Sequence, residues 1–238
     1  MRLGVGKMEE IARMDDREQE EVLDVASGLH RAARRGDSQL VSSLLQAGAD
    51  LDSPDQDGWT ALFLAAASAH TEVVESLVRE GADLNTQNKD GYSPLNWATE
   101  RGNTEVVWTL IKAGANLDIQ NRGGFTALYW AAQGGNTELV SRLIKAGANL
   151  ELRDKFNDNT ALHRAAELGH QDVVSELVKA KAGLDIQNRF GNTALHKAAY
   201  NGHGEVVETL IRAGADIRLQ NKGGRTAIQV AENDEIAR

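Results

Sequence analysis

The stretch Thr193–Ile217, TALHKAAYNGHGEVVETLIRAGADI, occurs in closely similar form several times along the chain. Residues 160–184 read TALHRAAELGHQDVVSELVKAKAGL, and residues 126–150 read TALYWAAQGGNTELVSRLIKAGANL. The spacing between copies is 33 residues in five cases and 34 in one. Such a fixed period indicates a repeat architecture. The copies open at Ser27, Thr60, Ser93, Thr126, Thr160, Thr193 and Thr226.

Each copy predicts two short helices joined by a turn. In the copy that opens at Thr126, Leu128, Ala131 and Ala132 fall on one face of a first helix, which the Thr126 hydroxyl can cap. The letters GGN at 134–136 interrupt this pattern, so a helical hairpin is expected. The second helix has its apolar positions at Leu139, Val140, Leu143 and Ile144.

A single copy cannot bury the apolar faces of both helices. Neighbouring copies are therefore expected to stack and to bury these faces against one another. Each second helix is followed by AGA or a close variant, in which a glycine such as Gly147 can end the helix in the left-handed conformation. The sequence thus predicts an all-α solenoid of helix pairs.

Several motifs of the quoted stretch resemble the ankyrin repeat: TALH at Thr193–His196, GH at Gly202–His203, EVVETLI at 205–211 and AGAD at 213–216. The resemblance covers roughly residues 24–238 and recurs in register six times plus a fragment. It implies a curved solenoid of L-shaped repeats, in which β-hairpin fingers and first helices line a concave groove. It also implies a protein that binds other proteins and rarely catalyses.

The register of the repeats predicts the domain organisation. An acidic helical extension is expected over residues 1–23, where it would cover the first copy, followed by the repeat domain over 24–238. The last copy has a first helix and then stops, so its outer interface is expected to be only partly covered. The repeats are placed at about 24–56, 57–89, 90–122, 123–156, 157–189 and 190–222, with a partial repeat at 223–238.

Composition excludes several classes of function. There is no cysteine, which excludes disulfides and thiolate chemistry. No apolar run reaches the roughly 18 residues of a membrane span, and the charged N-terminus does not match a signal peptide. We expect a soluble, monomeric, intracellular protein, cytoplasmic or nuclear. The net charge of −9 argues against nucleic-acid binding, which depends on basic residues.

Aromatic residues are the most informative departure from the repeat pattern. The finger position just before the opening Thr or Ser holds Trp59, Tyr92 and Phe125, and the groove position four residues after it holds Trp97 and Trp130. Aromatic residues supply much of the binding energy in protein interfaces. We therefore expect these five to anchor a partner. Phe63 and Tyr129 occupy the slot that the repeat usually fills with histidine, and packing against the fingers is the favoured reading for them.

Basic residues recur at the finger tips and at the groove position. Lys89, Arg122, Arg164 and Lys197 are candidates for orienting an acidic partner. Ordinary solvated charge is the alternative reading for each of them. The finger-tip position also holds Arg189 and Lys222, and the groove position of the first copy holds Arg31.

One copy departs from the backbone pattern. The extra residue of the 34-residue spacing lies in RDKFNDN at 153–159, and Asp158 stands where neighbouring copies have glycine. Lys181 also replaces a glycine, after the second helix. Either Lys181 takes the left-handed conformation, at about 1 kcal/mol, or the helix continues and ends at Gly183. We expect this copy to be the least stable.

Catalytic and cofactor chemistry finds no support in the sequence. All six histidines occupy two recurring slots without metal-ligand spacing, so no metal is expected. The serines lack the strand-to-helix elbow of a hydrolase, and no glycine pair is followed by the Lys-Ser or Lys-Thr of a phosphate loop. No catalytic residue and no cofactor are predicted.

These patterns predict a non-enzymatic module that binds an acidic and apolar peptide or protein surface through its concave groove. Two alternatives remain open. Aromatic residues beside Lys89 and Arg122 could hold a nucleotide-like phosphorylated ligand, or the chain could be a structural spacer within a larger scaffold protein.

Overall fold

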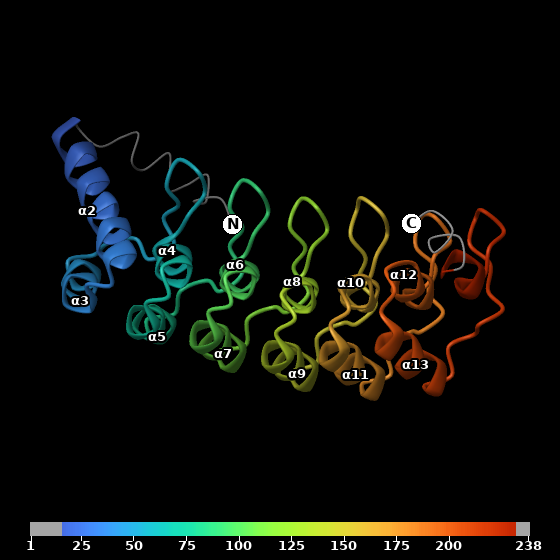
Figure 1. Cartoon of the computed structure of the whole chain (residues 1–238). Helices are drawn as coiled ribbons and strands as arrows, with labels where there is room; N and C mark the ends of the chain where they lie inside the picture. The colour runs from blue at the N-terminus through green and yellow to red at the C-terminus, as the bar shows by residue number, and fades with distance from the viewer. Residues whose placement is uncertain (1–15, 232–238) are drawn as a thin grey trace. The chain divides into compact units, whose positions relative to one another are not determined.

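The computed structural model describes residues 16–231, with side chains from residue 26 onward (Figure 1). The chain divides into two compact units, Met1–Asn116 and Leu117–Arg238, which we call unit 1 and unit 2. Each unit is described by itself. In both units the elements are short helices arranged in pairs, which confirms the expected all-α stack of helical hairpins.

The described part of unit 1, from residue 16 onward, contains three pairs of helices. There α2 packs against α3 and α4, and α4 packs against α5 and α6. The second helices form their own layer, in which α5 contacts α3 and α7. The elements are α2 (Asp16–Arg35), α3 (Ser38–Gln46), α4 (Ala61–Ala67), α5 (Thr71–Arg79), α6 (Pro94–Glu100) and α7 (Thr104–Lys112).

Unit 2 repeats the same arrangement. The first helix α10 packs between α8 and α12, and the second helix α11 packs between α9 and α13. Each first helix also packs against its own second helix. The elements are α8 (Ala127–Gln133), α9 (Thr137–Lys145), α10 (Ala161–Leu168), α11 (Gln171–Lys179), α12 (Ala194–Tyr200) and α13 (Gly204–Arg212).

The residue that opens each copy caps the first helix, as the sequence predicts. The Thr126 hydroxyl accepts a hydrogen bond from the Tyr129 amide at 3.1 Å, and Thr60, Ser93, Thr160 and Thr193 cap their helices in the same way. The first copy differs, because α2 runs without a break from Asp16 through Ser27 to Arg35. The boundary expected near residue 24 therefore falls inside a helix. Residues 1–15 and 232–238 lie outside the described residues.

The core is built from one leucine in each first helix and aliphatic residues of the second helices. The six leucines at this slot are at most 2% exposed: Leu29, Leu62, Leu95, Leu128, Leu162 and Leu195. In the last copy the slot holds Ile228, which is 54% exposed. The partly open end that the sequence predicts is therefore confirmed for the described residues.

The copies are joined by hairpin loops, the fingers, which project to the same side within each unit (Figure 1). In the finger of unit 1 that contains Tyr92, the Asn88 amide donates to the Tyr92 carbonyl at 3.0 Å, and the Asn88 side chain accepts from the Asp90 and Tyr92 amides. No strand occurs among residues 16–231, so hydrogen-bonded turns make the fingers.

The irregular copy of unit 2 keeps the backbone of its neighbours. Lys181 has φ of 64° and Asp158 has φ of 59°, so both take the left-handed conformation that glycine has at these slots elsewhere. Of the two alternatives for the end of α11, the left-handed lysine is confirmed. The extra residue is accommodated by Asp154, whose carboxylate accepts from the amides of Phe156, Asn157 and Asn159.

Candidate protein-binding surface

Four rings form a cluster in unit 1, which we call aromatic cluster 1: Trp59, Phe63, Tyr92 and Trp97. The centroid of the Trp97 ring lies 5.2 Å from that of Trp59 and 5.1 Å from that of Tyr92, both in edge-on geometry. Edge-on pairs of this kind are the favourable arrangement for aromatic side chains. Three of the rings keep part of their surface open to solvent. Phe63, fully buried, packs 4.5 Å from Trp59 and forms the floor of the cluster, which confirms the packing role predicted for it.

Arg101 adds a cation to aromatic cluster 1. Its guanidinium carbon lies 5.0 Å from the centroid of the Trp97 ring, from an exposed position just after α6. A guanidinium over an indole face is a favourable cation–π contact. Arg101 falls outside the recurring basic slots, so the repeat pattern gave no signal for it. The contact fixes the indole of Trp97 and keeps one of its faces beside a positive charge.

Unit 2 carries a second group, aromatic cluster 2: Phe125, Tyr129, Trp130 and Phe156. The Phe125 ring lies 4.7 Å from Tyr129, 5.0 Å from Trp130 and 5.8 Å from Phe156. Tyr129 is 6% exposed, so the packing role predicted for it is confirmed as well. Phe156 is 61% exposed and is not among the predicted site residues. The cluster therefore extends from α8 to the neighbouring finger.

A buried carboxylate underlies aromatic cluster 2. Burial raises the pKa of the Tyr129 hydroxyl, and the negative charge of the nearby Asp154 carboxylate raises it further. Asp154 is itself buried and accepts three backbone amides of its finger. The tyrosine is thus kept neutral beside a carboxylate that the finger carrying Phe156 holds in place.

The predicted groove cations Arg164 and Lys197 both contact Glu167. Arg164 Nη1 lies 2.9 Å from Glu167 Oε2, and Lys197 Nζ lies 2.9 Å from Glu167 Oε1. Burial alone would raise the pKa of Glu167, but the hydrogen bonds from Lys197 and Arg164 outweigh it and lower the pKa. Any acidic partner would have to compete with Glu167 for these two cations. Arg164 Nε also donates to Gln133 Oε1 at 3.2 Å.

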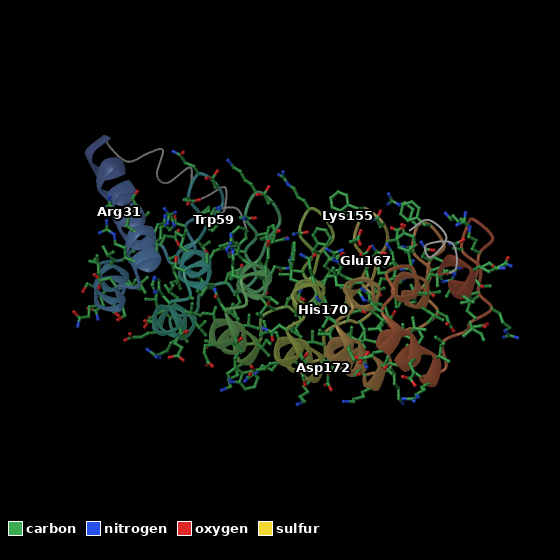
Figure 2. All side chains as sticks on the ribbon, in the orientation of Figure 1. Arg31, Trp59, Lys155, Glu167, His170 and Asp172 are labelled. Carbon is green, nitrogen blue, oxygen red and sulfur yellow. The ribbon has the colours of Figure 1, made fainter. Side chains whose placement is uncertain are left out.

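The finger cations are placed differently. Lys89 and Arg122 lie exposed at finger tips, and Lys89 Nζ is 3.7 Å from Asp57 Oδ1. Lys155, at the corresponding tip position of the irregular copy, is also exposed. Figure 2 shows Lys155 at the level of the fingers and Glu167 nearer the first helices, so the two charges lie at different levels of unit 2.

The repeats of this chain match models of a known protein family. A family model described as ankyrin repeats (3 copies) matches residues 29–121 and 113–188, and a second, described as ankyrin repeats (many copies), matches residues 177–231. The chain belongs to the ankyrin-repeat family. Ankyrin-repeat domains typically bind proteins and are generally non-catalytic. A search of curated proteins finds no match.

Two solved structures show how far the similarity reaches. The ankyrin repeat domain of Bcl-3, described as a unique member of the IkappaB protein family, is 29% identical with a TM-score of 0.79. That alignment covers 86% of this chain and 93% of the Bcl-3 domain. An ankyrin repeat domain from Acinetobacter baumannii AYE is 34% identical with a TM-score of 0.75, and the alignment covers 79% of this chain and 98% of that one.

Five of the six histidines of this ankyrin-repeat chain bind backbone carbonyls of adjacent copies, and His30 binds the Ser53 carbonyl of its own copy. His163 Nε2 donates to the Asn192 carbonyl at 3.0 Å, and its Nδ1 accepts from the Thr160 amide. In the other slot, His170 Nε2 donates to the Gln133 carbonyl at 3.0 Å. Histidines of both slots therefore join neighbouring copies through hydrogen bonds. Among the described residues no group of His, Asp or Glu could hold a metal ion, and no helix is long and apolar enough to cross a membrane.

Proposed function

We propose that this ankyrin-repeat domain is a non-enzymatic binding module for a protein segment that carries apolar and acidic residues. Each unit has its own anchor for apolar residues of such a segment, aromatic cluster 1 in unit 1 and aromatic cluster 2 in unit 2. The exposed finger cation of the same unit, Lys89 or Arg122, orients the segment. Within a unit, the segment lies along the face that the fingers and first helices form.

The observation that carries the proposal is the exposed part of the tryptophans on the first helices. Trp97 and Trp130 occupy a slot that holds Arg164 and Lys197 in other copies, so the fold does not require an indole there. Both indoles are only half-buried and are held edge-on by neighbouring rings. Preordered rings of this kind bind with little further loss of side-chain freedom.

Arg164 and Lys197 remain part of the proposal in a secondary role. Because both are already paired with Glu167, they contribute most where a ligand carboxylate displaces it. Most of the charge recognition is therefore assigned to the finger tips.

The test compares wild type with the Trp97→Ala/Trp130→Ala variant in selection from a displayed library of random peptides. We expect wild type to select peptides rich in aromatic, aliphatic and acidic residues, and the double variant to lose at least about tenfold in affinity for them. Trp108→Ala serves as the matched control, since Trp108 lies on the second helix α7, beside Lys112.

Unchanged affinity in the double variant, at unchanged helix content, would overturn the proposal. Titration with ATP and ADP tests the nucleotide-like alternative, because stacking on these indoles would quench their fluorescence. A spacer would bind neither peptides nor nucleotides.

A further inference from the structure

The fingers of unit 2 form one hydrogen-bonded row, which we call the fingertip row: Asn121–Phe125, Asp154–Asn159, Asn188–Asn192 and Asn221–Arg225. Each finger is closed internally, with the Asn188 amide donating to the Asn192 carbonyl at 2.9 Å, for example. Successive fingers are also joined, since the Lys155 amide donates to the Gly123 carbonyl at 2.9 Å and the Lys222 amide to the Phe190 carbonyl at 2.9 Å. The row is therefore a preordered edge.

This edge is positively charged although its surroundings are not. Unit 2 holds 15 basic and 15 acidic residues, whereas the fingertip row holds five basic and two acidic ones. Of these two acids, Asp154 is buried under backbone amides and Asp158 lies 3.5 Å from Arg189. One exposed cation follows the opening Asn or Asp of every finger: Arg122, Lys155, Arg189 and Lys222.

The fingers of unit 1 show that this charge does not come with the fold. The corresponding segments Asp55–Trp59 and Asn88–Tyr92 hold one basic and three acidic residues. In the fingertip row, by contrast, neither Lys155 nor Lys222 forms an ion pair with another described residue. Both ammonium groups are available to a ligand.

Two exposed phenylalanines lie beside these cations. Phe156 follows Lys155, Phe190 follows Arg189, and their exposed fractions are 61% and 52%. Gly123 leaves room for the Phe156 ring, since a Cβ atom at residue 123 would lie 3.1 Å from it. Large apolar side chains held out on adjacent loops mark a contact surface for a partner.

The spacing of the row defines the ligand. Packed helices lie about 8 to 10 Å apart, so equivalent cations on successive fingers recur at about that distance. An extended peptide advances about 3.3 Å per residue, and three residues therefore span one finger. A nucleic-acid strand carries a negative charge about every 3.4 Å. One cation per finger would leave most of these phosphates without a partner, so the row fits a nucleic acid poorly.

We propose that the fingertip row binds an extended segment of a partner protein with an acidic residue at every third position and apolar residues between them. The carboxylates pair with Arg122, Lys155, Arg189 and Lys222, and the intervening side chains cover Phe156 and Phe190. The inference rests on the proposed function in that it names the ligand of a protein-binding domain, but it uses residues other than Trp97 and Trp130.

The test uses two synthetic peptides of identical composition, one with four acidic residues spaced three apart and the other with the same four spaced two apart. Each is titrated into the full chain by fluorescence anisotropy. We expect the three-residue spacing to bind at least about fivefold more tightly, because only it aligns every carboxylate with a cation. Equal affinities would overturn the proposed register.

Variants then locate the binding. Lys155→Glu should weaken binding of the three-spaced peptide about tenfold, whereas Lys145→Glu, the same charge change at an exposed position on α9, should leave it unchanged. Phe156→Ser with Phe190→Ser should weaken it without loss of helix content. Equal effects of the two lysine variants would contradict a site on the fingers.

Two further arms separate this inference from its rivals. If Trp97→Ala/Trp130→Ala loses selected peptides but keeps the three-spaced peptide, the fingertip row acts independently of Trp97 and Trp130. If Lys155→Glu binds the three-spaced peptide as tightly as wild type, the proposed function still stands and this inference is removed. Binding of single-stranded DNA or of phosphatidylserine vesicles as tightly as the three-spaced peptide would replace peptide recognition by general attraction of anions.

Discussion

Lys197 on α12 contacts Glu167 on α10 at 2.9 Å, and this ion pair joins two consecutive first helices of unit 2. Glu167 also accepts Arg164 of its own helix, so a single partly buried carboxylate holds two cations. Isolated surface pairs contribute little to stability, but removing the shared member of a partly buried set leaves both partners uncompensated.

Glu167→Gln should therefore lower the free energy of unfolding by about 1 kcal/mol, measured by urea denaturation at pH 7. The variant should also bind acidic peptides more tightly, because Arg164 and Lys197 lose their internal competitor. Glu176→Gln is the control, since Glu176 pairs with the exposed Lys179. A Glu167→Gln protein as stable as wild type would show that the network contributes nothing.

The stability of unit 2 should depend on pH through His163. Burial lowers the pKa of His163 to about 4, while the hydrogen bond to Asn192 opposes that shift and the charge of Lys197 adds to it. The unfolded state takes up a proton near pH 6.5 and the folded state does not. The stabilisation that depends on an uncharged His163 is therefore complete above pH 6.5, decreases as the pH falls, and is lost by about pH 4. The free energy of unfolding should change by up to about 3 kcal/mol over this range.

His163→Asn isolates this effect, because Asn96 fills the same slot in another copy and bonds to its capping Ser93. The slope of the unfolding free energy between pH 6.5 and 4 should become shallower in the variant. It should not vanish, since burial also lowers the pKa of His196. An identical slope in wild type and variant would rule out His163 as the titrating group.

Lys181→Gly should stabilise the chain by up to about 1 kcal/mol, because glycine takes the left-handed conformation without the strain of a Cβ atom. The φ of 64° at Lys181 is imposed by the turn after α11, which glycine makes at the equivalent Gly147 and Gly214. The denaturant midpoint measures the change. Lys179→Gly, at the last residue of α11, should instead destabilise the chain. A clear fall in the denaturant midpoint of Lys181→Gly would show that the backbone at Lys181 is not strained.

Gly123→Ala should disturb aromatic cluster 2. A Cβ atom there would lie 2.7 Å from the Phe125 ring, so the ring must move, at about 1 kcal/mol. The near-ultraviolet circular dichroism of the aromatic residues should change and peptide affinity should fall. Gly223→Ala is the matched control, because its nearest neighbour is the Asn221 side chain at 3.2 Å. Identical spectra in the Gly123 variant and wild type would refute the crowding.

Much of the fold could be predicted from the sequence because the determinants are local and repeated. Thr126 and its equivalents cap helices through an amide three residues away, and the six buried leucines recur with the period of the repeat. Periodicity also identified Phe63 and Tyr129 as packing residues. Ser27 lacks this behaviour because the residues before it continue the helix, which a repeat register cannot reveal.

The charge pattern of the site was harder to predict because it depends on pairs about thirty residues apart. No recurring position of the repeat marks Glu167 as the partner of a groove cation. Its pairing with Lys197 is therefore visible only once the two helices are packed together. Phe156 was missed for another reason. Phe156 lies in the irregular finger with the extra residue, so its position could not be taken from the other copies. The folded turn around Asp154 places its exposed ring beside that of Phe125.

The exposed Ile228 at the end of unit 2 determines where unfolding should start. In a linear array each copy is held only by its neighbours, so a copy whose core leucine slot lies open to solvent loses its structure at the lowest free energy. Amide hydrogen exchange should therefore be faster near Ile228 than in α13. Local opening of unit 2 would then begin beside Ile228 and spread to α13.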